Sequence, residues 1–505
     1  MLIEFSTAFA NPDPRSAVAT IAPCAAFPAP ARRNELPAKQ AGPGSRDVRF
    51  RSHSRIDDWT KSKSRIAMSI RANENGFFSL RTGLQLCIRV LIGLGAVNAY
   101  ADVPDSERAV LLAIYNGTGG TAWSNRGGWT FGSVCGWYGI SCMTDVQGQE
   151  HISSIDLSQN GLTGQLPPSL SGLPYLQVFD VHGNGITGQL PALGGLTSLE
   201  SFGAGTNQFS GPVPSLTGLT ALRYFDVGGN LLTGSLPALT GLTSLEVFIA
   251  YYNQLSGPIP LLEGMTNLKY FDVDTNQLTG SIPELSGLIE LEYFDVDSNE
   301  MTGAIPDLSG LANLVYFYVN SNRLTGSIPD LSGPSAPTNL RYFYVFDNQL
   351  SGALPSLSSL TGLTGLYAYS NHLTGPIPPL TGLSNLANFD VSANQLTGSI
   401  PDLAGLTNLY LFKVDHNLLD GSVPEISSLT NLGRFQIDHN RIGGFLPYPP
   451  SSLQLASVCP NPLKFPSMVI GVDPKWSAIT GYSPWWTAPF ASNACDDLFN
   501  DAFDP

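Results

Sequence analysis

The chain of 505 residues has few charged side chains, 13% of the total, with only 25 Lys and Arg against 40 Asp and Glu. Basic residues are scarcest in residues 102–505, which hold 11 of the 25 basic and 33 of the 40 acidic side chains. A body with so much uncompensated negative charge repels nucleic acids and anionic membranes. The composition therefore excludes nucleic-acid binding and favours cationic or neutral polar partners.

The sequence also lacks the motifs of catalytic and cofactor sites. It has no nucleophile elbow, no phosphate-binding loop, no HExxH zinc motif and no catalytic pairing of cysteine with histidine. Its many aspartates could in principle supply the paired carboxylates of a glycosidase. An open and shallow surface would not desolvate one of these acids and raise its pKa, however. We therefore predict neither an enzyme nor a bound cofactor.

No apolar run is long enough to span a bilayer, because the run Val90–Val97 is far too short. It fits a secretory signal that begins at Met68 and ends at the small-x-small site before residue 102. We interpret residues 68–101 as a signal peptide and residues 1–67 as a disordered leader or an untranslated extension of the gene model. An organelle-targeting leader rich in Arg and Ser is the alternative. The prediction is a secreted or cell-surface protein.

What the sequence has in abundance is one repeated unit. An asparagine recurs in steps of 24, then six of 23, one of 26 and four of 23, and the long step contains extra residues at 333–337. These asparagines are Asn160, Asn184, Asn207, Asn230, Asn253, Asn276, Asn299, Asn322, Asn348, Asn371, Asn394, Asn417 and Asn440. A fixed period of this size with the pattern L-x-x-L-x-L-x-x-N-x-L indicates a leucine-rich-repeat solenoid.

The unit at residues 268–283, LKYFDVDTNQLTGSIP, shows why its positions are fixed. Leu268, Phe271, Val273 and Leu278 are predicted to point inward, and neighbouring coils must stack to bury them. Asn276 comes where the chain turns away from a short strand, and its amide can satisfy buried backbone groups that would otherwise cost about 1–3 kcal/mol each. The recurring asparagines are therefore predicted to be structural.

The second half of the unit, L-T-G-x-I-P, is nearly intact at Leu278–Pro283, Leu324–Pro329, Leu373–Pro378 and Leu396–Pro401. It resembles the plant-type class of extracellular leucine-rich repeats, found in receptor ectodomains and polygalacturonase-inhibiting proteins. The resemblance covers about residues 105–460. It implies a right-handed horseshoe with a parallel concave sheet, and a second short strand on the convex side. We expect 13 repeats over residues 151–453, between an N-terminal cap at 102–150 and a C-terminal cap at 454–505.

Cysteines flank this array on both sides. The element Cys135-Gly-Trp-Tyr-Gly-Ile-Ser-Cys142 resembles the N-terminal cap of plant-type repeat proteins, and Cys459 and Cys495 lie in the C-terminal cap. Of the six cysteines, Cys24 and Cys87 lie in the leader and the signal peptide. The other four allow three pairings, but the caps lie at opposite ends of a long rod. We therefore expect the disulfides Cys135–Cys142 and Cys459–Cys495, which form in an oxidising compartment.

A binding face is predicted on the strands, since side chains that flank the inward residues of a strand point away from the core. We define an acidic strip as Tyr224, Asp226, Tyr270, Asp272, Asp274, Tyr293, Asp295 and Asp297, and an aromatic shelf as Tyr316, Tyr318, Tyr342, Tyr344, Phe346, Tyr367 and Tyr369. Exposed aromatic side chains are enriched in binding hot spots. Carboxylates on adjacent strands repel one another, so a cationic ligand or Ca²⁺ would relieve that repulsion. Passive copying of one repeat is the alternative explanation.

Two histidines occupy equivalent positions in adjacent repeats, His416 after Asp415 and His439 after Asp438. Such a set could bind zinc, but pairs of this kind are more often solvated surface residues, and we predict no metal site.

The function that we predict from the sequence is that of a non-catalytic recognition protein. It would act as a monomer and bind an extracellular protein, peptide or polysaccharide. A structural or adhesive surface protein is the alternative.

Overall fold

The computed structural model describes residues 102–463 and 473–480. All of them belong to one compact unit, Leu94–Pro505, while a separate unit, Met1–Gly93, lies outside the described residues. The predicted leader and signal peptide therefore remain predictions. Within the described part of the chain, no helix has the length and apolar character needed to cross a membrane.

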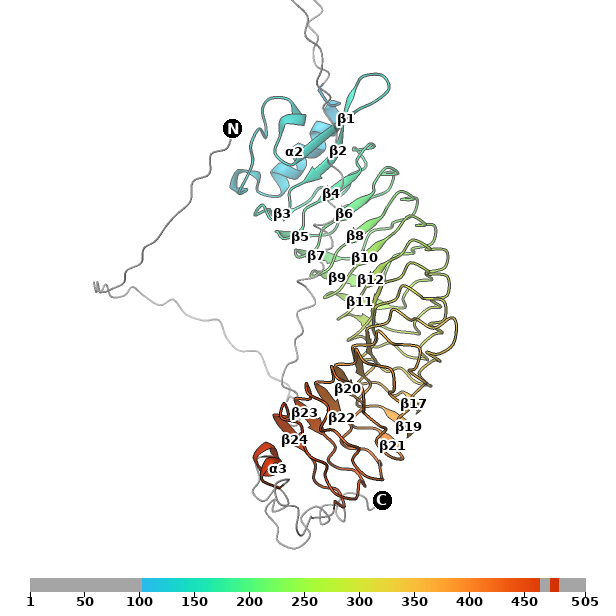
Figure 1. Ribbon diagram of the computed structural model, residues 1–505. Coiled ribbons are helices and arrows are strands. Elements are labelled where there is room, and N and C mark those ends of the chain that lie inside the picture. Colours follow the sequence, from blue (N-terminus) through green and yellow to red (C-terminus); the bar gives the residue numbers. More distant parts are fainter. Residues whose placement is uncertain (1–101, 464–472, 481–505) are drawn as a thin grey trace, which may run out of the picture. The chain divides into compact units, whose positions relative to one another are not determined.

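The repeats form one long sheet of 15 strands, to which each coil adds one strand of about three residues (Figure 1). The first two strands pair antiparallel, and every later neighbour pairs in parallel and in register, as Phe248 does with Phe271. In order, the strands are β1 (Ile140–Thr144), β2 (Glu150–Asp156), β4 (Val178–Asp180), β6 (Ser201–Gly203), β8 (Tyr224–Asp226), β10 (Val247–Ile249), β12 (Tyr270–Asp272), β14 (Tyr293–Asp295), β15 (Tyr316–Tyr318), β16 (Tyr342–Tyr344), β18 (Gly365–Tyr367), β20 (Asn388–Asp390), β22 (Leu411–Lys413), β23 (Arg434–Gln436) and β24 (Leu455–Ser457).

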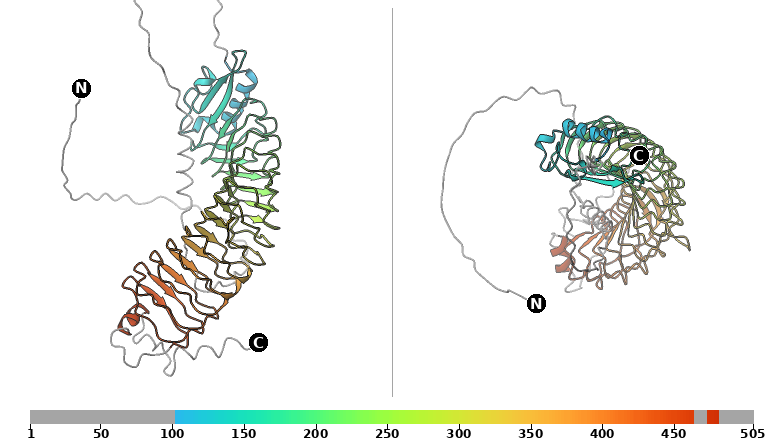
Figure 2. Two further views of the ribbon diagram at one scale, coloured as in Figure 1. Left: turned by 45° about the vertical axis from the view of Figure 1, so that its right-hand side comes forward. Right: turned by 90° about the horizontal axis from the view of Figure 1, so that it is seen from above.

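A second set of short strands follows the turn in many coils, as the resemblance implied. They form a six-stranded and a three-stranded sheet beside the long one. The first consists of β3 (Thr163–Gln165), β5 (Gly185–Gly188), β7 (Gln208–Gly211), β9 (Leu231–Gly234), β11 (Gln254–Gly257) and β13 (Gln277–Leu278), and the second of β17 (Ser351–Ala353), β19 (His372–Pro376) and β21 (Gln395–Thr397). Seen from above, the coils follow a curve (Figure 2). The architecture is the predicted leucine-rich-repeat solenoid.

The core is a column of identical side chains. Because neighbouring strands pair in register, each inward phenylalanine lies over its copy in the next coil, and the rings stack from Phe179 to Phe343 with centroids 5.4–5.6 Å apart. Leu366 interrupts the column, which resumes from Phe389 to Phe435. These rings are essentially fully buried, so the apolar period of the sequence becomes one continuous core.

The recurring asparagine has the predicted structural role. In Asn322, Nδ2 donates to the backbone carbonyls of Val296, Val319 and Asn320, and Oδ1 accepts from the backbone N–H of Met301. The same bonds recur along the array. Asn461, which the repeat analysis did not include, accepts from the N–H of Ile442 in the same way and is fully buried.

Both ends of the core are covered by aromatic side chains. At the N-terminal end lie helix α2 (Asp105–Gly117) and the 3₁₀ turns η1 (Gly120–Ala122) and η2 (Val134–Gly136). There Trp129 packs against Trp123, Trp137 and Tyr115. At the other end, helix α3 (Asp473–Thr480) places the buried Trp476 on Phe435, with ring centroids 6.5 Å apart.

The predicted disulfide Cys135–Cys142 is present in the N-terminal cap. Cys459 is also disulfide-bonded, but Cys495 lies outside the described residues. The pairing of Cys459 with Cys495 therefore stays a prediction.

Candidate functional site

The residues of the acidic strip and the aromatic shelf lie along the long sheet, on strands β8, β12, β14, β15, β16 and β18 and the turns that follow them. Parallel register aligns Tyr270, Tyr293, Tyr316 and Tyr342 in one row. Tyr224 and Asp226 are set apart from the others by β10, whose Val247 and Ile249 are buried. The structure thus joins most of the predicted site into one surface and separates its first two residues by one coil.

Within this surface the aromatic rings pack on one another. Tyr270 stacks on Tyr293 with centroids 4.2 Å apart, and Phe346 stacks on Tyr369 at 4.4 Å. Tyr316 lies parallel to Tyr342 at 5.2 Å, and Tyr318 stacks on Tyr344 at 4.6 Å. The ring faces are therefore covered by neighbouring rings, and a ligand would meet ring edges and phenolic hydroxyls. Such a surface suits a ligand rich in hydrogen-bonding groups, since aromatic edges carry positive partial charge.

Gly365 makes room for this packing in the shelf. A Cβ at this position would lie 3.2 Å from Tyr342, 3.5 Å from Tyr367 and 3.6 Å from Tyr344. Any larger residue at position 365 would therefore have to displace the surrounding tyrosine rings.

In the acidic strip, each strand aspartate is held by its own coil. The hydroxyls of Tyr224, Tyr270 and Tyr293 donate to Oδ2 of Asp226, Asp272 and Asp295 at 3.2, 3.0 and 2.9 Å. The Oδ1 atoms of the same aspartates accept the backbone N–H two residues further on. Asp272 and Asp295 are only 4% and 6% exposed. These two carboxyls lie on the predicted face but are covered by the tyrosines, so they are less accessible than their outward position in the strand implies.

This burial changes the acidity of the strip. Desolvation raises the pKa of Asp226 to about 6. Burial raises the pKa of Asp272 and Asp274, and repulsion from the neighbouring carboxyl of Asp297 raises both pKa values further. The pKa of Asp295 is raised well above its ordinary value for the same reasons.

The expectation that an open face would not desolvate these acids is therefore wrong. It failed because tyrosine rings pack over the carboxyls, an arrangement that the shallow curve of a solenoid does not reveal. A raised pKa does not by itself make a general acid, because the acid must also reach a bound substrate. The oxygens of Asp272 and Asp295 are instead occupied by hydrogen bonds within their own coils.

Three tyrosines of the shelf, Tyr318, Tyr344 and Tyr367, remain neutral at physiological pH. Burial raises the pKa of Tyr367 to about 12, and it raises the pKa of Tyr318 and Tyr344 further. Their hydroxyls can therefore donate and accept hydrogen bonds without carrying charge.

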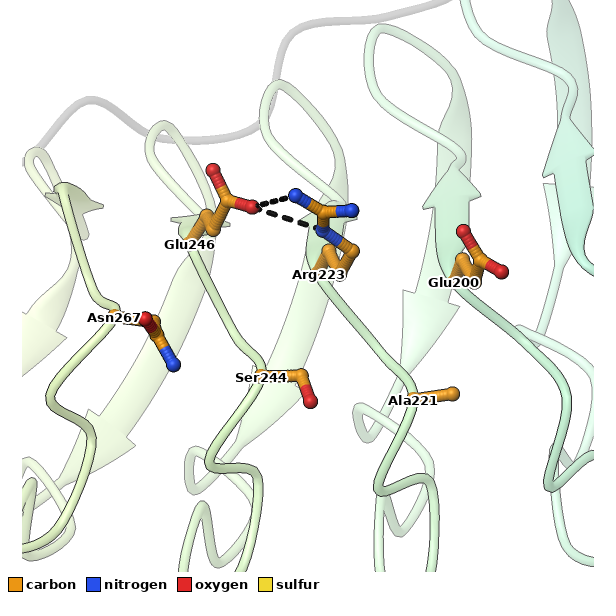
Figure 3. Close-up of a pocket in the computed structure, with 6 residues that line it drawn as sticks. All are labelled: Glu200, Ala221, Arg223, Ser244, Glu246 and Asn267. Atoms are coloured by element: carbon orange, nitrogen blue, oxygen red, sulfur yellow. Dashed lines mark hydrogen bonds and ion pairs between the residues drawn. The ribbon is translucent and has the colours of Figure 1, made fainter. Parts of the chain in front are cut away.

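A depression on the flank of the sheet was not anticipated from the sequence. It has a volume of about 340 Å³ and is lined by Glu200, Ala221, Arg223, Ser244, Glu246 and Asn267 (Figure 3). Arg223 donates to Glu246 from the preceding coil, and Lys269 contacts the same carboxylate at 2.9 Å from the next coil. The signal was in the sequence, as Glu200, Arg223, Glu246 and Lys269 alternate in charge at the repeat spacing.

One group of side chains in the described ranges could hold a metal ion. It consists of His416, Asp438 and His439, whose candidate ligand atoms all lie within 4.8 Å of one another. The group is located in the turns after β22 and β23, in the C-terminal coils and outside the strip and the shelf.

Comparison with known proteins supports the leucine-rich-repeat architecture of the described residues. The Leucine Rich Repeat family model matches residues 151–173, and a comparison with curated sequences gives no match. Among solved structures, the chain is similar to a TDR receptor at 35% identity and a TM-score of 0.58, covering 62% of this chain and 56% of that one.

Two further structures are similar over comparable lengths. PEPR1 in a structure with AtPEP1 is 29% identical with a TM-score of 0.65, covering 71% of this chain and 52% of that one. The plant peptide hormone receptor RGFR1, in complex with RGF2, is 30% identical with a TM-score of 0.51, covering 61% of this chain and 55% of that one. The chain thus spans about half the length of these three proteins.

Proposed function

We propose that this chain is a non-catalytic recognition protein that binds an extended peptide or protein segment on the acidic strip and the aromatic shelf. The observation that carries the proposal is that the outward side chains change in chemical type from coil to coil, while the inward ones remain apolar. At the register positions of Tyr270 and Asp272, other coils have Ser201 and Gly203. The fold therefore does not require tyrosine and aspartate at these positions, and a binding role explains their clustering.

The chemistry of the surface favours a cationic or neutral peptide over a flat apolar ligand. Ring edges and neutral hydroxyls suit backbone carbonyls and polar side chains, and the acidic residues of the strip attract positive charge. Peptide binding also agrees with the similarity to RGFR1, which is described as a plant peptide hormone receptor. A polysaccharide is the second ligand class, although the stacked rings leave few open faces for sugar.

We further propose that the protein acts outside the cytoplasm as a monomer. The Cys135–Cys142 disulfide supports an oxidising compartment. Residues 68–101 would be a cleaved signal peptide, with residues 1–67 not part of the mature chain. Residues 102–150, 151–453 and 454–505 would form the N-terminal cap, the repeat array and the C-terminal cap.

The test is direct binding by the full chain to synthetic peptides of matched length and net charge +4, 0 and −4, with cell-wall oligosaccharides as a second panel. We expect the cationic peptides to bind most tightly and their affinity to fall with added salt. Replacing Tyr316, Tyr318 and Tyr344 together with Ala should weaken binding at least about tenfold, the scale of a hot-spot loss.

The matched control is Tyr410→Ala, which removes an exposed tyrosine that precedes β22 on the flank of the sheet. This variant should bind like the unaltered chain. If the triple variant keeps full affinity, the face is not the binding site, and a structural or adhesive role becomes the better explanation. Hydrolysis of the oligosaccharides by the purified chain would contradict the non-catalytic assignment.

A further inference from the structure

We propose that His416, His439 and Asp438 form a binding site for zinc or another first-row divalent transition metal. The two histidines occupy the same position in adjacent coils, immediately before the ladder asparagine. Both have a left-handed backbone conformation with φ of 54°. The backbone N–H of His416 donates to the carbonyl of Asp438 at 2.9 Å, which fixes the two turns side by side.

The side chains of the two histidines are arranged in parallel. Their rings stack with centroids 4.0 Å apart and planes 13° apart. Nδ1 of His416 lies 3.0 Å from Oδ2 of Asp415, and Nδ1 of His439 lies 2.8 Å from Oδ2 of Asp438. Because Asp438 contacts its histidine through Nδ1, an ion that takes Asp438 as a ligand would bind the imidazoles on their Nδ1 side, in place of the protons of these hydrogen bonds. The Nδ1 atoms of both rings therefore face carboxylate oxygens, and the hydrogen bonds hold the two rings in place.

A second observation points to a bound cation. Asp438 is only 7% exposed, yet its Oδ1 is buried and has no hydrogen-bond partner in the described part of the chain. A buried carboxylate oxygen without a donor is costly, and a cation beside it would remove that cost. Asp415 also has an unpartnered Oδ1, but Lys413 lies 4.0 Å from that atom. The ammonium group of Lys413 therefore partly compensates the unpartnered oxygen of Asp415, whereas a bound cation could compensate that of Asp438.

The ligand types identify the class of metal. Two imidazole nitrogens and one carboxylate oxygen suit zinc and its neighbours in the first transition row, whereas calcium and magnesium prefer oxygen alone. The three ligand atoms lie within 4.8 Å of one another, and a tetrahedral zinc ion would bring them to within about 3.4 Å. The histidine side chains are 53% and 47% exposed, so they have room to rotate inward. A fourth position would stay open to water or to a ligand.

Sequence alone favoured solvated histidines at these positions. What it does not show is the stacking of the rings, the carboxylate on each Nδ1 and the unpartnered Oδ1 of Asp438. The site is independent of the strip and the shelf, so it does not depend on the proposed function.

The test is calorimetric titration of the full chain, purified without a histidine tag, with Zn²⁺, and absorption spectroscopy with Co²⁺. We expect one Zn²⁺ per chain at this site and a tetrahedral Co²⁺ spectrum. His416→Ala, His439→Ala and Asp438→Asn should each weaken binding at least about tenfold, because each variant removes one of the three ligands. Zinc should also raise the Tm of the unaltered chain more than that of the three variants.

The matched control is His182→Ala. His182 also contacts a carboxylate through Nδ1, at 2.8 Å from Asp180, but the coil before it has Gln159 near its ring rather than a second histidine. This variant should bind Zn²⁺ like the unaltered chain. The proposal is overturned if the unaltered chain binds no Zn²⁺, or if His182→Ala weakens binding as much as His416→Ala does.

Discussion

At the scale of single residues, the ladder asparagine shows how one amide organises a coil. Asn322 donates to three backbone carbonyls and accepts one backbone N–H, and these four groups belong to two adjacent coils. Only a side chain with both a donor and an acceptor on a short stem can do this. The residue before it is forced into the left-handed region in most coils, with φ from 47° at Tyr252 to 54° at His416.

We therefore predict that Asn322→Ala destabilises the array strongly. The substitution leaves buried backbone groups without partners, and we expect a loss of about 3 kcal/mol, since each such group costs about 1–3 kcal/mol. The measurement is the urea midpoint of the full chain followed by circular dichroism. The control is Asn313→Ala, because Asn313 makes one exposed hydrogen bond to the carbonyl of Ile289. Equal shifts for the two variants would contradict the assigned role of the ladder.

Thirteen of the ladder asparagines could be found from the sequence because one period places them all in one register. Asn461 was missed because it lies between two prolines, only 21 residues after Asn440, in a coil where Ala456 replaces the phenylalanine of the core column. Hydrogen bonding identifies it where spacing does not. Its Nδ2 donates to the carbonyls of Ile437 and Val458.

At the scale of elements, the stacked coils turn each repeated position into a column. The phenylalanine column is the strongest case, with each ring buried between two copies of itself. Register explains the stacking, because parallel strands lie about 4.8 Å apart and place like residues opposite one another.

We predict that Phe294→Ala lowers the free energy of unfolding by about 3–5 kcal/mol, the usual cost of emptying a buried phenylalanine site. Phe294→Leu should cost about 1 kcal/mol, because the chain already has Leu366 at the same position in another coil. Thermal unfolding of both variants measures the difference. A loss for the leucine variant as large as for the alanine variant would show that ring stacking, rather than filled volume, stabilises the column.

The column of charged side chains on the flank of the sheet should contribute much less to the stability of the fold than the phenylalanine column does. Arg223, Glu246 and Lys269 form a chain of ion pairs across three coils, but the side chain of Arg223 is 59% exposed. We expect Glu246→Gln to cost less than about 1 kcal/mol. The effect should fade in 1 M NaCl, because salt screens exposed charges. A shift in Tm that persists unchanged at high salt would indicate that the flank depression has a role beyond charge pairing.

The period of 23 and the alternation of side chains in a strand predicted the long sheet and the face of each column, and the resemblance to plant-type repeats implied the second short strands. The sequence could not predict how the tyrosines of the strip and the shelf pack. Register brings the rings close together, but whether they stand free or stack depends on rotamers. Here they stack, and in the strip they cover Asp272 and Asp295.

At the scale of the whole array, this packing links the acidic strip to the response of the fold to pH. Burial and mutual repulsion raise the pKa of Asp272, Asp274 and Asp295 above the ordinary value of 3.8. Between that value and the raised pKa values, the folded chain holds more protons than the unfolded chain. The free energy of unfolding therefore falls as pH rises through this window. A bound cationic peptide would offset the loss, because it neutralises the carboxylates that form there.

We predict that Asp274→Asn makes the array more stable at pH 8 and changes its stability little at pH 4. Asp274 has a buried Oδ1 without a partner among the described residues and sits among the carboxyls of neighbouring coils. At pH 8 folding must keep this carboxyl protonated or bury its charge, and asparagine removes that cost, so the free energy of unfolding should rise by on the order of 2 kcal/mol. The control is Asp307→Asn, since Asp307 is exposed and its hydrogen bonds with Ser309 lower its pKa, which gives the opposite sign. The measurement is Tm from pH 4 to pH 8. If Asp274→Asn does not raise Tm at pH 8, the charge of Asp274 does not destabilise the folded chain, and the prediction is wrong.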